Sequence, residues 1–78
     1  MRAIIRFSVD NEQNRALGNK LTKVLTDAGF TAAANTATYE RVGLQAHGLG
    51  QILQEFWSTA HAHAGPGRID HFWMYSDR

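Results

Sequence analysis

Apolar and polar residues alternate near both ends of the chain. Residues 2–9, RAIIRFSV, place four apolar side chains on one side at a period of two, namely Ala3, Ile5, Phe7 and Val9. The other side carries Arg2, Ile4, Arg6 and Ser8. Such alternation predicts a strand with one packed face.

A second strand is predicted over residues 69–75, IDHFWMY. Phe72 and Met74 share one face, and the other face carries Ile69, His71, Trp73 and Tyr75. Because both faces are largely apolar, the pattern favours a strand that is central or covered on both sides.

Two amphipathic helices are predicted between these strands. The first, residues 11–28, has an apolar stripe of Leu17, Leu21, Val24, Leu25 and Ala28. Asp10 and Gln13 have the spacing of a capping box at its start, and Gly29 has the place of a left-handed residue at its end. The second helix, about 44–63, packs a broad face of Leu49, Ile52, Leu53, Phe56, Trp57 and Ala60. Gly65-Pro66-Gly67 ends it.

Residues 30–42, FTAAANTATYERV, are too long for one strand of so small a domain. We predict a hairpin with its turn near residues 34–36, where Asn35 tolerates left-handed geometry. The alternative is a single strand followed by a loop.

The predicted order is β-α-β-β-α-β, which indicates an α+β fold of the ferredoxin-like type. Residues 1–78 form one domain, with two helices on one face of a four-stranded antiparallel sheet. The opposite face is left uncovered. We expect it to carry Arg2, Ile4 and Arg6 from the first strand and His71, Trp73 and Tyr75 from the last.

Three explanations fit two aromatic residues and two arginines on an uncovered sheet. The face forms a homodimer interface, or it binds single-stranded nucleic acid by stacking bases on aromatic rings. In the third explanation, the side of the strand that we assign to the open face lies under the helices instead, and the aromatic residues belong to the core. We favour the homodimer because a domain of 78 residues buries a small core and the net charge is only +1.

The amino-acid composition of the chain excludes some classes of function. The near-neutral charge argues against a protein that coats nucleic acid by bulk charge. The chain has no cysteine, which excludes disulfides and thiolate metal sites. No apolar run is long enough to cross a membrane, and residues 1–9 do not resemble a signal peptide, so we expect a cytoplasmic location and no membrane partner.

A few polar residues are candidates for chemistry. Asp10, where the first strand ends, either caps the helix or holds a divalent cation such as Mg²⁺. Its candidate partners are Glu40, Asp70, Asp77 and the Asp10 of a second copy. His61 and His63 fall at a helix end, where residues two apart diverge, so a favourable helix terminus is expected rather than a metal site. A small-molecule site beside Trp57 is a further alternative.

The first half of the chain resembles a known group. A hydrophobic strand ends at Asp10, and the helix after it carries Leu21, Val24 and Leu25. Ala28-Gly29-Phe30 then precedes a strand region rich in Thr and Tyr that ends in Tyr39-Glu40. This resembles the small ferredoxin-like dimers of the virulence-associated protein D ribonucleases and the small CRISPR-associated adaptation subunit, over residues 3–40 and the last strand. The resemblance implies a homodimer. It also implies that Asp10, at the strand end, serves metal-dependent cleavage of RNA or DNA.

The sequence therefore leads to two hypotheses. The first is a small homodimeric binding or interaction module that assembles through its uncovered sheet face or its edge strands. The alternative is a metal-dependent endoribonuclease or nucleic-acid-binding protein, with Asp10 holding Mg²⁺ between subunits.

Overall fold

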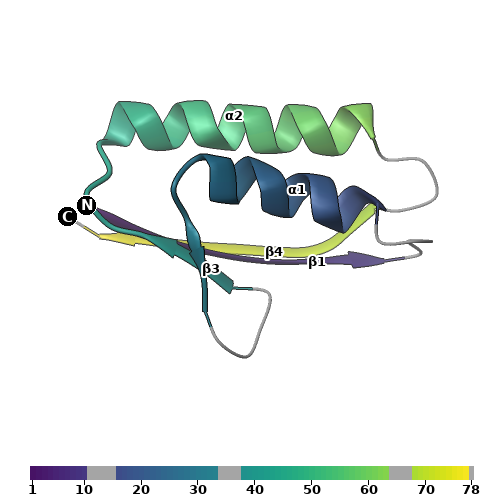
Figure 1. Ribbon diagram of the computed structural model, residues 1–78, viewed down its shortest axis with the longest axis horizontal. Coiled ribbons are helices and arrows are strands. Elements are labelled where there is room, and N and C mark those ends of the chain that lie inside the picture. Colours follow the sequence, from purple (N-terminus) through teal and green to yellow (C-terminus); the bar gives the residue numbers. More distant parts are fainter. Residues whose placement is uncertain (11–15, 34–37, 64–67, 78) are drawn as a thin grey trace.

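The computed structural model describes residues 1–10, 16–33, 38–63 and 68–77. These residues form β1 (Arg2–Asp10), α1 (Ala16–Asp27), β2 (Thr31–Ala32), β3 (Thr38–Arg41), α2 (Ala46–Ala62) and β4 (Arg68–Asp77). The strands make one antiparallel sheet in the order β2-β3-β1-β4. Both helices lie on the same side of that sheet (Figure 1). The predicted ferredoxin-like arrangement is confirmed.

β1 lies inside the sheet, with β3 on one side and β4 on the other. The apolar side chains of β1 face the side that the sequence predicts, because Ala3, Ile5 and Phe7 are buried under the helices. On either side of Ile5 lie Tyr39 of β3 and Met74 of β4, and all three side chains pack in or against the core.

Phe56 of α2 occupies the centre of the core and is fully buried. Its ring meets Phe7 of β1 edge-on with centroids 5.3 Å apart, and Phe72 of β4 at 5.4 Å. From α1 the core receives Leu17, Leu21 and Leu25, as the helical stripe predicts. The core thus joins both helices to the two longest strands.

The end of α1 has the predicted geometry. Gly29 has φ = 91°, a left-handed conformation that residues with a Cβ rarely adopt. The N–H of Gly29 donates to the carbonyl of Thr26, and that of Phe30 to the carbonyl of Leu25, both at 3.0 Å. These bonds satisfy carbonyls that the helix leaves without a partner. The predicted start of α1 and Gln13 of the capping box fall on residues 11–15, outside the described part, whereas Asp10 is the last residue of β1.

The hairpin prediction is confirmed by the pairing of β2 with β3, in which Thr31 lies opposite Glu40. Its predicted turn at 34–36 lies outside the described residues, as does Gly65-Pro66-Gly67 after α2. The second helix begins at Ala46 rather than Leu44. Leu44 is buried instead, and its N–H donates to the carbonyl of Met1 at 3.0 Å.

Two predictions for the last strand are wrong. β4 lies at the edge of the sheet, not at its centre, and the helices cover one of its faces. Ile69 lies opposite Val9 and packs against the core, because a register shift between Ser8 and Val9 reverses the alternation at Asp70. β4 is also longer than predicted, since it includes Arg68 and extends to Asp77.

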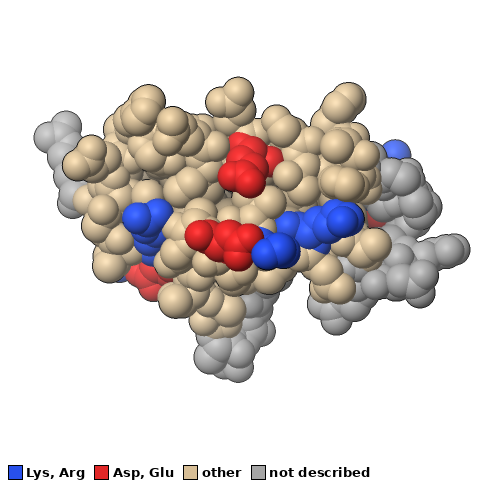
Figure 2. Space-filling model, turned by 45° about the horizontal axis from the view of Figure 1, so that its top comes forward, with Lys and Arg blue, Asp and Glu red and all other residues tan. Residues whose placement is uncertain are grey.

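The side covered by helices carries charges of both signs close to one another (Figure 2). On α1, Lys23 lies 2.8 Å from Asp27, and this hydrogen bond raises the pKa of Lys23. In the described residues, neither helix has the length and apolar character needed to cross a membrane. In the view of Figure 2 the charges of the described residues are mixed and form no patch of a single sign.

Candidate interaction surfaces

The uncovered side of the sheet forms the first candidate surface, which we call the open face. Three strands contribute to it: Arg2, Ile4, Arg6 and Ser8 from β1, His71, Trp73 and Tyr75 from β4, and Thr38 and Glu40 from β3. Cross-strand pairs set Tyr75 beside Ile4, Trp73 beside Arg6 and His71 beside Ser8. All six predicted residues of this face therefore come together.

Trp73 and Tyr75 form an exposed aromatic pair on the open face. Their ring centroids are 6.4 Å apart and their planes differ by 11°. Each side chain exposes 44% of its surface. The hypothesis that these rings belong to the core is therefore wrong. Their spacing follows from the strand, because residues i and i+2 project from the same face.

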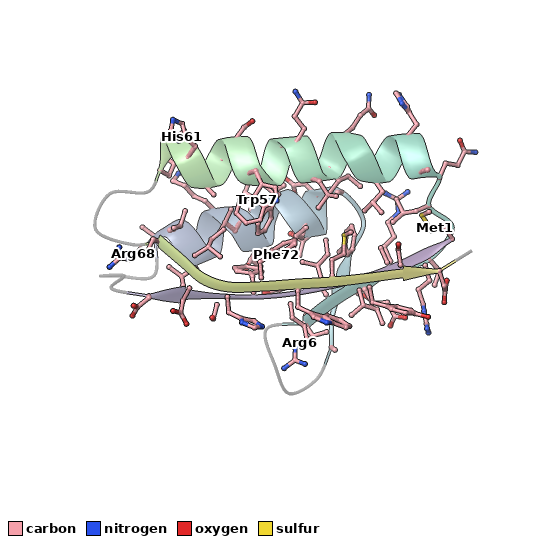
Figure 3. The ribbon with its side chains drawn as sticks, turned by 180° about the vertical axis from the view of Figure 1, so that it is seen from behind. Met1, Arg6, Trp57, His61, Arg68 and Phe72 are labelled. Carbon is pink, nitrogen blue, oxygen red and sulfur yellow. The ribbon has the colours of Figure 1, made fainter. Side chains whose placement is uncertain are left out.

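The two arginines of the open face have different surroundings. Arg2 lies 3.5 Å from Glu40 and 3.4 Å from Asp77, and its backbone N–H donates to Asp77 at 3.2 Å. Arg6 lies between Thr38 and Trp73 on the neighbouring strands and is exposed. It points away from the helices (Figure 3). Within the described residues Arg6 is in no ion pair, so its charge is available at the centre of the face.

The acidic residues divide between the two ends of the sheet. Asp10 lies opposite Arg68, and Asp70 follows at the bulge of the same strand pair. Glu40 and Asp77 lie at the other end, around Arg2. The described residues contain no group of three or more His, Cys, Asp or Glu placed to hold a metal ion. Within one chain, the structure therefore brings Asp10 near Asp70 alone among its predicted partners.

The histidines at the end of α2 diverge, as expected. His61 lines a groove on the outer side of α2, whereas His63 lines the cleft between the helices beside Lys20 and Lys23. The backbone N–H of His63 closes the helix by donating to Thr59 at 3.1 Å. These two side chains do not share a site.

The second candidate surface lies along β4 and was only partly anticipated. The groove on α2 has a volume of about 600 Å³ and is lined by Gly50, Leu53, Gln54, Trp57, Ser58 and His61. Trp57 exposes 44% of its surface, and its ring packs on Phe72 with centroids 4.9 Å apart. Figure 3 shows Trp57 between α2 and β4. We call this groove, together with the outer edge of β4, the edge surface.

The sequence held a signal for the edge surface in the composition of α2. In its 17 residues, Glu55 is the sole Asp, Glu, Lys or Arg. A helix that faces solvent along its outer side normally carries charges there. The sparse charge indicates that part of this outer side is adapted to contact rather than to water.

Comparisons with known proteins find no match for the chain. No family model, no curated protein and no solved structure matches the chain. The function is therefore argued from the two surfaces.

Proposed function

We propose that this chain is a homodimeric interaction module and that two copies join along the edge surface. The observation that carries the proposal is the character of β4. This strand of ten residues pairs with β1 along one edge, and no other described strand pairs with its outer edge.

The outer edge of β4 lacks the features that keep sheet edges apart. Residues 71–76, HFWMYS, contain no Lys, Arg, Asp, Glu or Pro. Natural edge strands are usually short, charged, bulged or covered, because their free N–H and C=O groups pair readily with another strand. The bulge of β4 lies near its start, at Asp70, and leaves the rest of the strand regular. The β4 strand of a second copy would form hydrogen bonds with the free N–H and C=O groups of this edge.

Apolar groups flank the edge on both sides of the sheet. Trp57 lies on the helical side, above Phe72, and Trp73 and Tyr75 lie on the open face. A partner copy paired along β4 would bring its own Trp57, Trp73 and Tyr75 next to these groups and would bury apolar surface at the junction on both sides of the sheet.

Pairing about a two-fold axis fits the ends of the strand. Antiparallel pairing sets the start of one β4 against the end of the other, so Arg68 approaches the region of the partner's Asp77. The two sheets then continue into one, and the two α2 helices lie next to each other over it. Opposite charges across strands stabilise such pairs modestly.

The cost of burying charged groups favours the edge of β4 over the open face as the dimer contact. Stacking two open faces would take Arg6 and the Arg2 ion pairs out of water, and buried charges are costly unless they are paired well. Pairing along β4 leaves these groups exposed.

The test is light scattering across protein concentrations, with Gln54→Lys as the variant. Gln54 is exposed and lines the groove, so a lysine there leaves the monomer intact but brings like charges together across the axis. We expect the dimer dissociation constant to rise about tenfold or more.

The matched control is Gln51→Lys, the same change at an exposed glutamine of α2 outside the groove lining. We expect this variant to dimerise like the wild type. A wild-type monomer at tens of micromolar would overturn the proposal, and equal effects of the two lysines would overturn the assigned surface.

A further inference from the structure

We propose that the open face binds single-stranded RNA, with bases stacking on Trp73 and Tyr75 and the phosphate backbone running past Arg6. This inference deepens the proposed function by naming the ligand of the module, and in that sense it rests on it. The proposed pairing along β4 leaves the open face uncovered in each copy.

The aromatic pair has the geometry of a stacking platform. Both rings are held by β4 at the edge of the sheet, their planes differ by 11°, and each is nearly half exposed. Aromatic side chains on an open sheet stack unpaired bases of single strands, which a duplex keeps hidden. The pre-set orientation of the two rings limits the entropy lost on binding.

The charges of the open face fit a polyanion at its centre. Arg6 lies directly across from Trp73, and its other neighbour is Thr38, which is neutral. The carboxylates of this face, Glu40 and Asp77, both contact Arg2, and Glu40 lies opposite Ile4, one cross-strand pair away from Arg6. A backbone phosphate beside Trp73 would therefore meet a guanidinium whose two cross-strand neighbours are uncharged.

Polar neighbours of the platform favour RNA. His71 and Ser8 lie side by side on β4 and β1, next in line after Trp73 and Arg6. A hydroxyl and an imidazole both donate and accept hydrogen bonds, as a ribose 2′-hydroxyl does. That hydroxyl is what distinguishes RNA from DNA at a given site.

The proposed dimer would enlarge this platform. With β4 at the junction, both aromatic pairs lie close to the two-fold axis on one continuous sheet. A longer strand could contact both pairs, whereas a short one needs a single pair. Affinity for a short oligonucleotide therefore tests the platform without depending on the dimer.

The experiment measures fluorescence anisotropy of a labelled oligouridine of about six nucleotides. Trp73→Leu should weaken binding about tenfold, within the range found when a stacking ring is removed. The matched control is Val42→Ala, since Val42 is a large apolar side chain that exposes 68% of its surface just after the end of β3, two strands away from Trp73. It should leave the affinity of the short RNA unchanged.

A second pair of variants tests the charge. Arg6→Gln should weaken binding and reduce its salt dependence by about one phosphate contact. Lys20→Gln removes one positive charge from the exposed side of α1 and should have no such effect. Equal losses in both would indicate attraction by net charge alone and would overturn the site.

Two further outcomes would overturn the proposal. One is the absence of binding at about 50 mM salt, where phosphate contacts are strong. The other is equal affinity for the corresponding DNA, which would overturn the assignment to RNA. Light scattering on the same samples reports the dimer separately. RNA binding by the Gln54→Lys monomer would uphold this site, and a dimer that does not bind RNA would overturn it while leaving the proposed function standing.

Discussion

Trp57 and Trp73 expose the same fraction of their surface, 44%, on opposite sides of one sheet. Trp57 is supported by Phe56 and Phe72, with ring centroids 5.3 and 4.9 Å away. Trp73 pairs with Tyr75 and has Arg6 as its neighbour on β1. Trp57 is thus an extension of the core toward the edge, whereas Trp73 belongs to a polar and cationic surface. We assign them different roles for that reason.

The two arginines of the open face differ in a similar way. Arg2 contacts two carboxylates at the end of the sheet, and those contacts use its charge within the monomer. Ion pairs that are exposed to this degree contribute little to stability. Arg6 has neutral neighbours on both adjacent strands, so it is the arginine that a ligand would meet first.

Asp10 remains the residue to test for the cleavage that the resemblance to small ribonucleases implies. If that activity is present, Asp10→Asn should reduce Mg²⁺-dependent cleavage of RNA about 10²-fold or more, in line with the loss of one catalytic group. Asp10 is exposed, so the fold should be retained, as circular dichroism can check.

Asp27→Asn is the matched control, since Asp27 is also exposed but lies at the end of α1, where it contacts Lys23. Cleavage that is unchanged in Asp10→Asn would remove the hypothesis.

At the level of elements, the end of α1 depends on one backbone conformation. Gly29 has φ = 91°, and a Cβ added there would lie 3.4 Å from the side chain of Arg41, whose guanidinium donates to the carbonyl of Ala28. We expect Gly29→Ala to lower the free energy of unfolding by about 1 kcal/mol, because alanine is strained in that region. Urea denaturation measures the change.

Gly48→Ala provides the comparison for Gly29→Ala. Gly48 lies within α2 in a helical conformation, and an added Cβ would meet nothing within 4 Å. Alanine there should stabilise the helix by up to about 1 kcal/mol. A loss of stability in Gly48→Ala, or none in Gly29→Ala, would contradict this account of the two glycines.

The elements themselves could be predicted from the sequence because each has a clear period. The stripe of α1 and the alternation of β1 place Leu21 and Ile5 in the core, where both are fully buried. The face of Ile69 could not be predicted, because the bulge depends on how β4 pairs with β1 and not on β4 alone. The two apolar faces of β4 did not predict its place, since the strand lies at the edge of the sheet and the helices cover only one of its faces.

The candidate surfaces were predictable to different degrees. The open face follows from alternation and topology, so Arg6, Trp73 and Tyr75 could be placed together in advance. The edge surface could be anticipated only in part, from the sparse charge of α2, since Trp57 and Phe72 are far apart in sequence and meet only in the folded chain. Ion pairs at Arg2 likewise depend on which strands lie beside β1.

On the scale of the whole molecule, our proposals give the two surfaces different roles, the edge surface in self-association and the open face in ligand binding. The edge surface runs along the side formed by α2 and β4, and the open face lies underneath the sheet (Figures 1 and 3). β4 contributes to both. A dimer joined along β4 would therefore hold two copies of the open face in one plane, which gives self-association a direct consequence for ligand binding.

A domain of 78 residues buries a modest fraction of its surface, so a partner should contribute measurably to its stability. If unfolding is coupled to dissociation of the dimer, the melting temperature rises with protein concentration by mass action. We expect about 3–5 °C for each tenfold increase, given how strongly small domains respond to a kilocalorie per mole. Differential scanning fluorimetry over two decades of concentration measures this.

The Gln54→Lys variant makes that measurement decisive. Its melting temperature should begin to rise only at concentrations about tenfold or more above those at which the wild type responds, and at the lowest concentrations the melting temperatures of wild type and variant should converge. Gln51→Lys should follow the wild type throughout. A wild-type melting temperature that does not change with concentration would mean that a partner does not stabilise the folded monomer. The edge of β4 would then be exposed to solvent although its sequence carries few of the residues that protect edge strands from pairing.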